Sequence, residues 1–206
     1  MNFDFLLLTS FHLSFPPPKK AGIALHQSHR YTSTLQGNLK TDKMSTVTNS
    51  QGITPFLWFD GKAEEAMKLY TSIFPNSSIT TLKKWGEGSP FPADWVMGGT
   101  IIIDGLRVNL FDAGPQFKFN ESVSFFISCK NQEEVDRYWA QLTADGGEES
   151  MCGWLKDKFG LSWQIVPSFL MEKLSGGEPK RVGQMMQALG QMRKLNISEL
   201  EQAYNR

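Results

Sequence analysis

Histidine is missing from most of this 206-residue chain. All three histidines, His12, His26 and His29, lie within the first 43 residues, and none follows Met44. Imidazole is the commonest metal ligand among side chains and the usual base beside a catalytic serine or cysteine. A histidine-based metal centre and a histidine-activated nucleophile are therefore excluded from residues 44–206.

Cysteine, long apolar runs and net charge are scarce as well. The two cysteines, Cys129 and Cys152, are too few for a disulfide framework, have no zinc-ligand spacing and suit a reducing compartment. The chain has no run of 18 or more apolar residues, so no transmembrane helix is predicted. Its 21 basic residues balance 21 acidic ones, which leaves no charge signature of nucleic-acid or membrane binding. We expect neither partner, and we expect a cytoplasmic location.

The beginning of the chain differs in composition from the rest. Residues 1–43 hold five basic and two acidic residues, a charge of +3 that leaves −3 on the remainder. We predict that residues 1–52 are a disordered extension or a targeting segment. A mitochondrial transit peptide is one alternative, because the segment is poor in acids and rich in serine, and it would replace the cytoplasmic location. Another alternative is that synthesis starts at Met44.

From residue 53 onward the same pattern of elements occurs twice. A strand rich in β-branched and aromatic residues precedes an amphipathic helix at Ala63–Phe74, and several strands follow. The second copy has a helix that begins after Asn131, with Glu134 completing a capping box. Asp104-Gly105 indicates a hairpin turn. The two helices superpose with an offset of 69 residues, which indicates a repeated βαβββ unit.

The chain becomes helical after Pro167. A short helix is followed by a longer one predicted at Pro179–Leu195, and Asn196 begins a final helix that ends near Tyr204. Methionine and aliphatic side chains recur along one side of the longer helix, which favours a core or dimer contact over a ligand site. We predict that residues 168–206 form a helical tail that packs on the preceding domain or on a dimer partner.

Several motifs give the chain a family resemblance. They are "ITPFLWFDGKAEEAM", "NQEEVDRYW", "CGWLKDKFGLSWQIVP" and "RVGQMMQALGQMRKLNISELEQAY". These motifs resemble the PhnB-like family, often labelled the 3-demethylubiquinone-9 3-methyltransferase domain, of the vicinal oxygen chelate (glyoxalase/bleomycin-resistance) superfamily. The resemblance implies an α+β fold in which residues 53–167 form two βαβββ modules, with a curved eight-stranded sheet around a cleft. C-terminal helices follow, and members are usually dimers.

The resemblance also implies where a ligand would bind. Metal enzymes of the superfamily place histidine, glutamine or glutamate on the inward face of the first, fourth, fifth and eighth strands. The corresponding residues here are Pro55 (or Ile53), Asn109, Ser124 and Gln164. Asp112, near the end of the fourth strand, is the one carboxylate added to this candidate ligand-binding set. These side chains are poor metal ligands, so we expect no metal and no cofactor, but the amides and the hydroxyl suit a small polar ligand. Alternatively, they bond to one another in a closed core.

The sequence leaves catalysis open, and the catalytic residues are unknown. The methyltransferase label has no support, because no glycine-rich turn lies between a strand and a helix as S-adenosylmethionine binding requires. Cys152 has no histidine to activate it. Our first hypothesis is a metal-free homodimer that binds a small molecule. The alternatives are a metal-dependent glyoxalase- or dioxygenase-type enzyme that uses Asp112 and a partner chain, and a non-catalytic dimeric interaction module.

Overall fold

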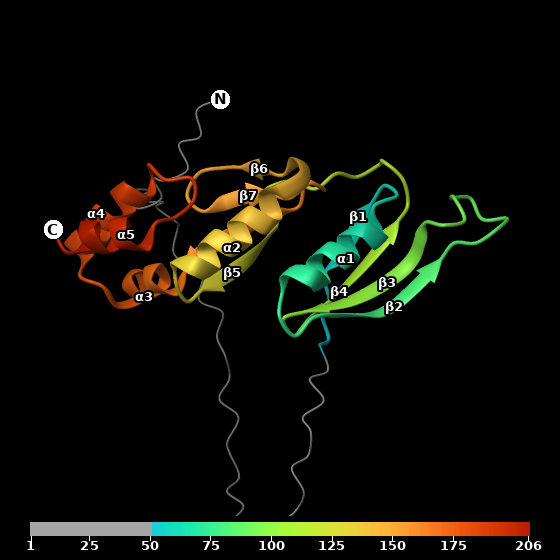
Figure 1. Ribbon diagram of the computed structural model, residues 1–206, viewed down its shortest axis with the longest axis horizontal. Helices are drawn as coiled ribbons and strands as arrows, with labels where there is room; N and C mark the ends of the chain where they lie inside the picture. Colours follow the sequence, from blue (N-terminus) through green and yellow to red (C-terminus); the bar gives the residue numbers. More distant parts are fainter. Residues whose placement is uncertain (1–50) are drawn as a thin grey trace, which may run out of the picture. The chain divides into compact units, whose positions relative to one another are not determined.

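The computed structural model describes residues 51–206. Residues 1–50, which hold nearly all of the predicted extension 1–52, lie outside the described residues. Residues 51–206 form two successive βαβββ modules followed by three helices (Figure 1). The predicted α+β class and repeated unit are confirmed. Across residues 51–206, no helix combines the length and the apolar composition that a membrane crossing requires.

The first module forms a four-stranded sheet with one helix. Its elements are β1 (Phe56–Phe59), α1 (Ala63–Ile73), β2 (Ser78–Lys84), β3 (Val96–Ile103) and β4 (Leu106–Asp112). The strand order is β1-β4-β3-β2, and β1 runs parallel to β4. The predicted hairpin turn lies between β3 and β4, where Asp104 and Gly105 both have positive φ angles, 45° and 85°. This geometry explains the Asp-Gly pair, because both residue types tolerate the left-handed region.

The second module repeats this arrangement in a sheet of its own. Its elements are β5 (Ser124–Cys129), α2 (Gln132–Thr143), a short 3₁₀ helix η1 (Ala144–Gly146), β6 (Glu148–Glu149), β7 (Trp154–Lys156) and β8 (Ser162–Pro167). The strand order is β5-β8-β7-β6, with β5 parallel to β8. The Asn131 side chain accepts a hydrogen bond from the N–H of Glu134 at 2.9 Å, and the Glu134 carboxylate accepts one from the N–H of Lys130 at 2.8 Å. The predicted capping box is confirmed, with its second bond one residue before the N-cap.

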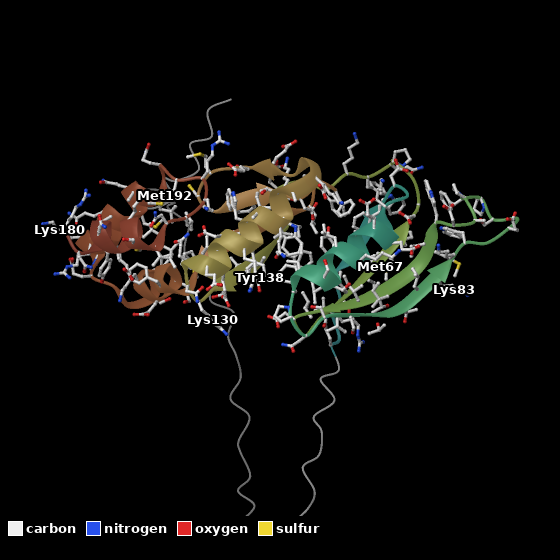
Figure 2. All side chains as sticks on the ribbon, viewed as in Figure 1. Met67, Lys83, Lys130, Tyr138, Lys180 and Met192 are labelled. Atoms are coloured by element: carbon white, nitrogen blue, oxygen red, sulfur yellow. The ribbon has the colours of Figure 1, made fainter. Side chains whose placement is uncertain are left out.

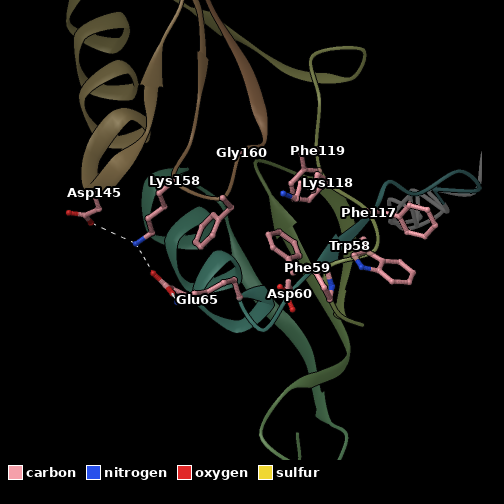
Figure 3. A pocket seen from close by; sticks show the side chains of 13 residues that line it. Trp58, Phe59, Asp60, Glu65, Phe117, Lys118, Phe119, Asp145, Lys158 and Gly160 are labelled. Atoms are coloured by element: carbon pink, nitrogen blue, oxygen red, sulfur yellow. Dashed lines mark hydrogen bonds and ion pairs between the residues drawn. The ribbon is translucent and has the colours of Figure 1, made fainter. Parts of the chain in front are cut away.

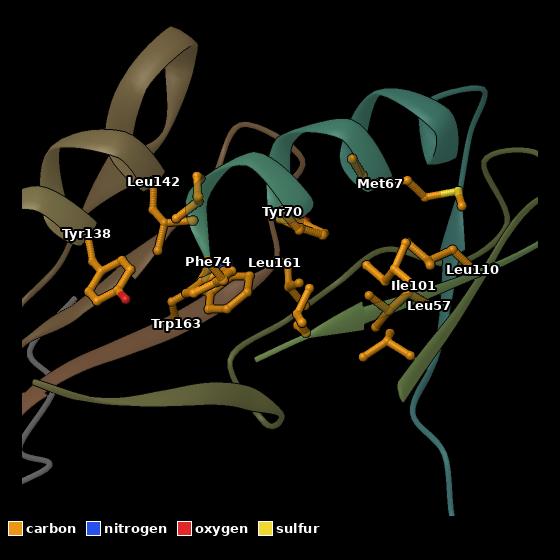
Figure 4. Packing of buried hydrophobic residues seen from close by; sticks show 14 of the residues in the cluster. Leu57, Met67, Tyr70, Phe74, Ile101, Leu110, Tyr138, Leu142, Leu161 and Trp163 are labelled. Atoms are coloured by element: carbon orange, nitrogen blue, oxygen red, sulfur yellow. The ribbon is translucent and has the colours of Figure 1, made fainter. Parts of the chain in front are cut away.

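Each helix covers one face of its sheet. The buried residues of α1, including Met67 and Tyr70, pack on β1, β3 and β4 (Figures 2 and 4). Gly99 of β3 permits this close approach, because a Cβ atom there would lie 2.6 Å from the Met67 sulfur. The core is continuous between the modules, since the Phe74 ring stacks on both Tyr138 and Trp163 at centroid distances of 5.4 Å. The opposite face of each sheet carries no helix of its own module, and we call it the helix-free face.

Asp157 joins the two modules. It is buried, and its Oδ2 atom accepts hydrogen bonds from the Tyr70 hydroxyl of α1 at 2.7 Å and from the Trp163 indole N–H of β8 at 2.9 Å. Its Oδ1 atom accepts from the backbone N–H groups of Phe159 and Leu161. Burial raises the pKa of Asp157, although these four donors oppose the shift. The carboxylate therefore links a helix of the first module to the β7–β8 turn of the second.

The C-terminal residues form three helices with a separate core. They are α3 (Ser168–Gly176), α4 (Pro179–Leu189) and α5 (Ile197–Tyr204). The prediction that the second of these helices continues to Leu195 is wrong, because α4 ends at Leu189 and Gly190 follows it. Instead, the carbonyls of Met192 (Figure 2) and Arg193 accept hydrogen bonds from the N–H groups of Cys152 and Gly153, at 2.7 and 2.8 Å. The tail is thus held to the turn that precedes β7 in its own chain.

Candidate functional site

On the first sheet, the polar candidate Asn109 lies on the helix-free face. Along β4, the buried Val108 and Leu110 alternate with half-buried Asn109 and Phe111. The Asn109 Oδ1 atom accepts a hydrogen bond from the hydroxyl of Thr100 on β3 at 3.0 Å. Asn109 is therefore tied to a neighbouring strand of its own sheet.

On the second sheet, Gln164 and Ser124 form a direct pair. The Gln164 Nε2 atom donates to the Ser124 Oγ atom at 2.8 Å. In the register of β5 and β8, Ser124 lies opposite Ser162 and Phe126 lies opposite Gln164, so the pair is diagonal across the two strands. The lone glutamine among the aliphatic residues of β8 thus serves a polar contact on the helix-free face, and its Oε1 atom makes no hydrogen bond within residues 51–206.

Ser162 was not among the predicted site residues. It is 1% exposed, and its hydroxyl is the one buried side-chain polar atom without a hydrogen-bond partner in the described part of the chain. A buried polar group left unpaired costs about 1–3 kcal/mol. Strand alternation was the signal that could have found it, since Ser162 lies two positions before Gln164 and shares its face. The cluster Ser124–Ser162–Gln164 therefore has unused hydrogen-bonding capacity.

The structure does not bring Asp112 to this cluster. Asp112 is 2% exposed and lies on the helix side of β4, where its Oδ1 accepts from the Ala63 N–H at 3.0 Å and its Oδ2 from the Val96 N–H at 2.9 Å. Both oxygens thus fasten the start of α1 and the start of β3. Strand alternation was the signal that could have separated Asp112 from the set, because it lies on the same face as Val108 and Leu110 rather than with Asn109.

The candidates from the first strand contribute no polar side chain. The Pro55 carbonyl accepts a hydrogen bond from the backbone N–H of Asn109 at 2.9 Å, and Ile53 is 91% exposed. The predicted residues thus separate into a Gln164–Ser124 pair on one sheet and Asn109 on the other. No hydrogen bond joins these two groups within residues 51–206.

These residues do not fit a divalent metal ion of the kind that the superfamily resemblance implies. Asn109, Ser124 and Gln164 are neutral donors, and a cation needs carboxylate or imidazole ligands that offset its dehydration. Asp112 already accepts two amide hydrogens on the other side of its sheet. Elsewhere in residues 51–206, no three His, Cys, Asp or Glu side chains gather in a metal-binding group.

Neither cysteine has the properties of a nucleophile. Burial raises the pKa of Cys129 to about 12, and burial also raises the pKa of Cys152. Both thiols are therefore protonated near neutral pH. Cys152 instead packs beside the apolar cluster of the tail.

A separate cavity of about 620 Å³ lies where the two modules meet (Figure 3). It is formed by the end of β1, the beginning of α1, the β4–β5 connection and the β7–β8 turn, with Asp145 of η1 at its edge. None of Pro55, Asn109, Asp112, Ser124 and Gln164 lines it. No local sequence pattern indicates this cavity, because its walls come from segments more than 100 residues apart, from Trp58 to Gly160.

The matching of this chain to known proteins identifies its family. The family described as 3-demethylubiquinone-9 3-methyltransferase matches residues 51–166. The chain belongs to this family. The match covers both βαβββ modules except for Pro167, the last residue of β8, and confirms the predicted resemblance to PhnB-like proteins.

One solved structure agrees with this membership, and two more distant matches are reported beside it. A PhnB protein from Bacillus cereus is 35% identical, with a TM-score of 0.55, and the match covers 57% of this chain and 100% of that chain. PA1353 from Pseudomonas aeruginosa is 21% identical, with a TM-score of 0.48 and coverage of 56% and 96%. The fosfomycin resistance protein FosX from Listeria monocytogenes is 16% identical, with a TM-score of 0.45 and coverage of 61% and 98%. Comparison with curated proteins gives no significant match.

The methyl transfer in the family description has no matching cofactor turn in residues 51–206 of this PhnB-like chain. The glycine pairs lie within β3 (Gly98-Gly99), after α2 (Gly146-Gly147) and at the end of α3 (Gly176-Gly177). A turn that cradles S-adenosylmethionine lies between a strand and the helix that follows it. The residues present do not fit that cofactor.

Proposed function

We propose that this PhnB-like chain binds a small, neutral, polar molecule on the helix-free face of its second sheet, without a metal. The observation that carries the proposal is the buried Ser162 hydroxyl without a partner, beside the Gln164–Ser124 hydrogen bond. A ligand that offers a donor and an acceptor would satisfy Ser162 and the free Oε1 atom of Gln164. The nearby side chains of Lys156 and Glu121 form an ion pair with each other, so neither of them favours a charged ligand.

A ligand would approach the Ser124–Ser162–Gln164 cluster from its half-exposed side. Gln164 is half-buried, and Phe126 beside it is exposed. Ser162 is fully buried, so a ligand reaches its hydroxyl only when the side chains around it move. A screen of neutral metabolites by thermal shift is the first experiment, because a ligand at 100 times its Kd adds about 2.7 kcal/mol of stability.

Two single substitutions test the cluster. Ser162→Ala removes a hydroxyl that has no partner, so it should leave the free energy of unfolding unchanged or slightly higher. Gln164→Ala breaks a hydrogen bond and should lower it by about 0.5–1.5 kcal/mol. Each change should weaken a ligand found in the screen by roughly 2- to 10-fold, the equivalent of one hydrogen bond. Calorimetric titration and chemical denaturation measure the two quantities.

A different pattern would contradict the ligand site. If Ser162→Ala lowers stability by 1 kcal/mol or more, the hydroxyl already has a structural partner, and the cluster is a closed core network.

Metal analysis of the purified protein addresses the rival enzyme hypothesis. Stoichiometric zinc, manganese or iron that is lost in Asp112→Ala would favour metal-dependent glyoxalase- or dioxygenase-type chemistry.

We also propose that the chain is a homodimer joined through the helix-free faces. Two aromatic side chains support this: Phe56 on the first sheet is 59% exposed and Phe126 on the second is 47% exposed. Large apolar side chains gathered on an exposed face mark interaction surfaces. Such a dimer would enclose the Ser124–Ser162–Gln164 cluster between two chains, which suits either ligand binding or a purely structural dimeric module.

Phe126→Asp tests the dimer. A charge on the helix-free face should convert the protein to monomers, seen as a halved mass in light scattering, while the melting temperature of the monomer changes little because the side chain is half-exposed. Met171→Asp on α3 is the matched control, since Met171 is exposed but lies on the tail. A wild-type protein that is monomeric, or a Phe126→Asp protein that stays dimeric, contradicts this interface.

A further inference from the structure

The cavity between the modules has an aromatic interior. Its aromatic lining consists of Trp58, Phe59, Phe117, Phe119 and Phe159. Phe59 packs edge-on against Phe119 at 5.2 Å and against Phe159 at 5.8 Å, so the interior is fixed by mutual contact. The volume of about 620 Å³ lies within the usual range for small-molecule sites. These walls suit a flat apolar body.

The charges around the cavity are balanced, but they are not equally engaged. Three lysines and three carboxylates line it. Glu65 accepts from Lys62 at 3.1 Å and from Lys158 at 2.8 Å, and Lys158 also lies 3.7 Å from Asp145 (Figure 3). That side of the cavity is therefore already neutralised by its own ion pairs.

Asp60 and Lys118 are the remaining charged residues of the lining. Both are exposed, and neither side chain makes an ion pair or a hydrogen bond with any residue in 51–206. They come from different segments, since Asp60 follows β1 and Lys118 lies in the β4–β5 connection. In the view of Figure 3, the Phe59 ring is drawn between them. One free negative group and one free positive group thus line the same cavity as the aromatic rings.

We propose that this cavity binds a small aromatic zwitterion, the class that includes the aromatic amino acids. The ligand's ammonium pairs with Asp60, its carboxylate pairs with Lys118, and its ring packs on Phe59 and Phe119. A ligand with a single charge would leave one of the two groups without a partner, whereas a zwitterion satisfies both and keeps the cavity neutral. The site is separate from the Ser124–Ser162–Gln164 cluster, and it goes beyond the proposed function.

The test uses probes that differ in one charge. L-Phenylalanine carries both charges close together, and 4-(aminomethyl)benzoate carries them at opposite ends of the ring. Phenethylamine lacks the carboxylate, and 3-phenylpropionate lacks the ammonium. The full chain is titrated at low salt, and binding is measured by calorimetry and by the NMR resonance of the Trp58 indole N–H. This N–H group donates a hydrogen bond to the Gly114 carbonyl at 2.8 Å. We expect at least one zwitterion to bind roughly tenfold more tightly than either single-charge analogue.

Substitutions assign each contact. Asp60→Asn should weaken the binding of the zwitterion and of phenethylamine by roughly five- to tenfold and leave the binding of 3-phenylpropionate unchanged. Lys118→Met should weaken the binding of the zwitterion and of 3-phenylpropionate by a similar factor and leave the binding of phenethylamine unchanged. Glu87→Gln and Lys180→Met (Figure 2) are matched controls, because both residues are exposed and neither lines the cavity. Asp60 and Lys118 make no side-chain bonds, so the melting temperature should not change.

Three outcomes would overturn the proposal. They are no binding of either zwitterion at millimolar concentration, equal binding of all four probes, and unchanged zwitterion affinity in both Asp60→Asn and Lys118→Met. Gln164→Ala separates this site from the proposed function, since it should leave the zwitterion affinity unaltered. Loss of zwitterion binding in Gln164→Ala would move the probe to the helix-free face and contradict the assignment to the cavity.

Discussion

Replacing Asp157 by alanine should lower the free energy of unfolding by roughly 3–5 kcal/mol, because it leaves buried donors unpaired at about 1–3 kcal/mol each. The Tyr70 hydroxyl and the Trp163 indole N–H both lose their acceptor, and both side chains are among the most deeply buried in the described chain. The N–H groups of Phe159 and Leu161 lose theirs as well. Chemical denaturation measures the loss, which removes a large share of the stability of an ordinary domain.

Smaller changes in the Asp157 hydrogen-bond network should lower stability by smaller amounts. Asp157→Asn keeps one oxygen but turns an N–H₂ group towards two donors, so we expect a loss of about 1–3 kcal/mol. Tyr70→Phe removes one donor and leaves the carboxylate with three, with an expected loss of about 1 kcal/mol. The losses of stability from Asp157→Asn and Tyr70→Phe should not add in the double variant, since these two side chains share a hydrogen bond. Asp60→Ala is the control, because its exposed carboxylate makes no bond within residues 51–206 and should change stability by less than about 0.5 kcal/mol.

An Asp157→Ala protein with wild-type stability would contradict this account. It would mean that the four donors find water when the carboxylate is removed, and that the modules are held together by apolar packing alone. Phe74, stacked between Tyr138 and Trp163, would then carry the junction.

Deleting residues 168–206 should make the protein insoluble or strongly destabilised. The tail buries an apolar cluster that includes Val166 of β8, and it supplies acceptors for the N–H groups of Cys152 and Gly153. Gln132, the first residue of α2, also donates to the Leu195 carbonyl at 3.1 Å and accepts from the Ile197 N–H at 2.9 Å. Without the tail these groups and the apolar surface would face water.

A point substitution measures how much the tail cluster contributes to stability. Leu200 of α5 is fully buried in the tail cluster, and Leu200→Ala should cost about 2–5 kcal/mol in a denaturation experiment. Leu174→Ala is the matched control, because Leu174 is 44% exposed and its truncation should cost much less. A truncated chain that stays soluble with native stability would show that the tail is dispensable to the modules.

Local chemistry was sufficient to predict several features of the fold. The amphipathic spacing of α1 and α2, the Asp104-Gly105 turn and the Asn131 cap each depend on residues within a few positions of one another. The repeat and the β7–β8 hairpin motif then indicated the family, which the match over residues 51–166 confirms. Alternation along β8 is consistent with the position of Gln164 opposite the helix-covered face, since its neighbours Trp163 and Ile165 are buried in the main core.

The sequence by itself determined the elements, their repetition and the absence of histidine from residues 44–206, because these follow from residue identity and short-range spacing. Only the tertiary structure decided which partners the polar groups meet. Asp112 accepts from Ala63, 49 positions away, and Asp157 accepts from Tyr70, 87 positions away. α4 ends at Leu189, and the carbonyls of Met192 and Arg193 accept hydrogen bonds from Cys152 and Gly153, some 40 positions away. Such contacts depend on how two modules and a tail pack together, which no local pattern specifies.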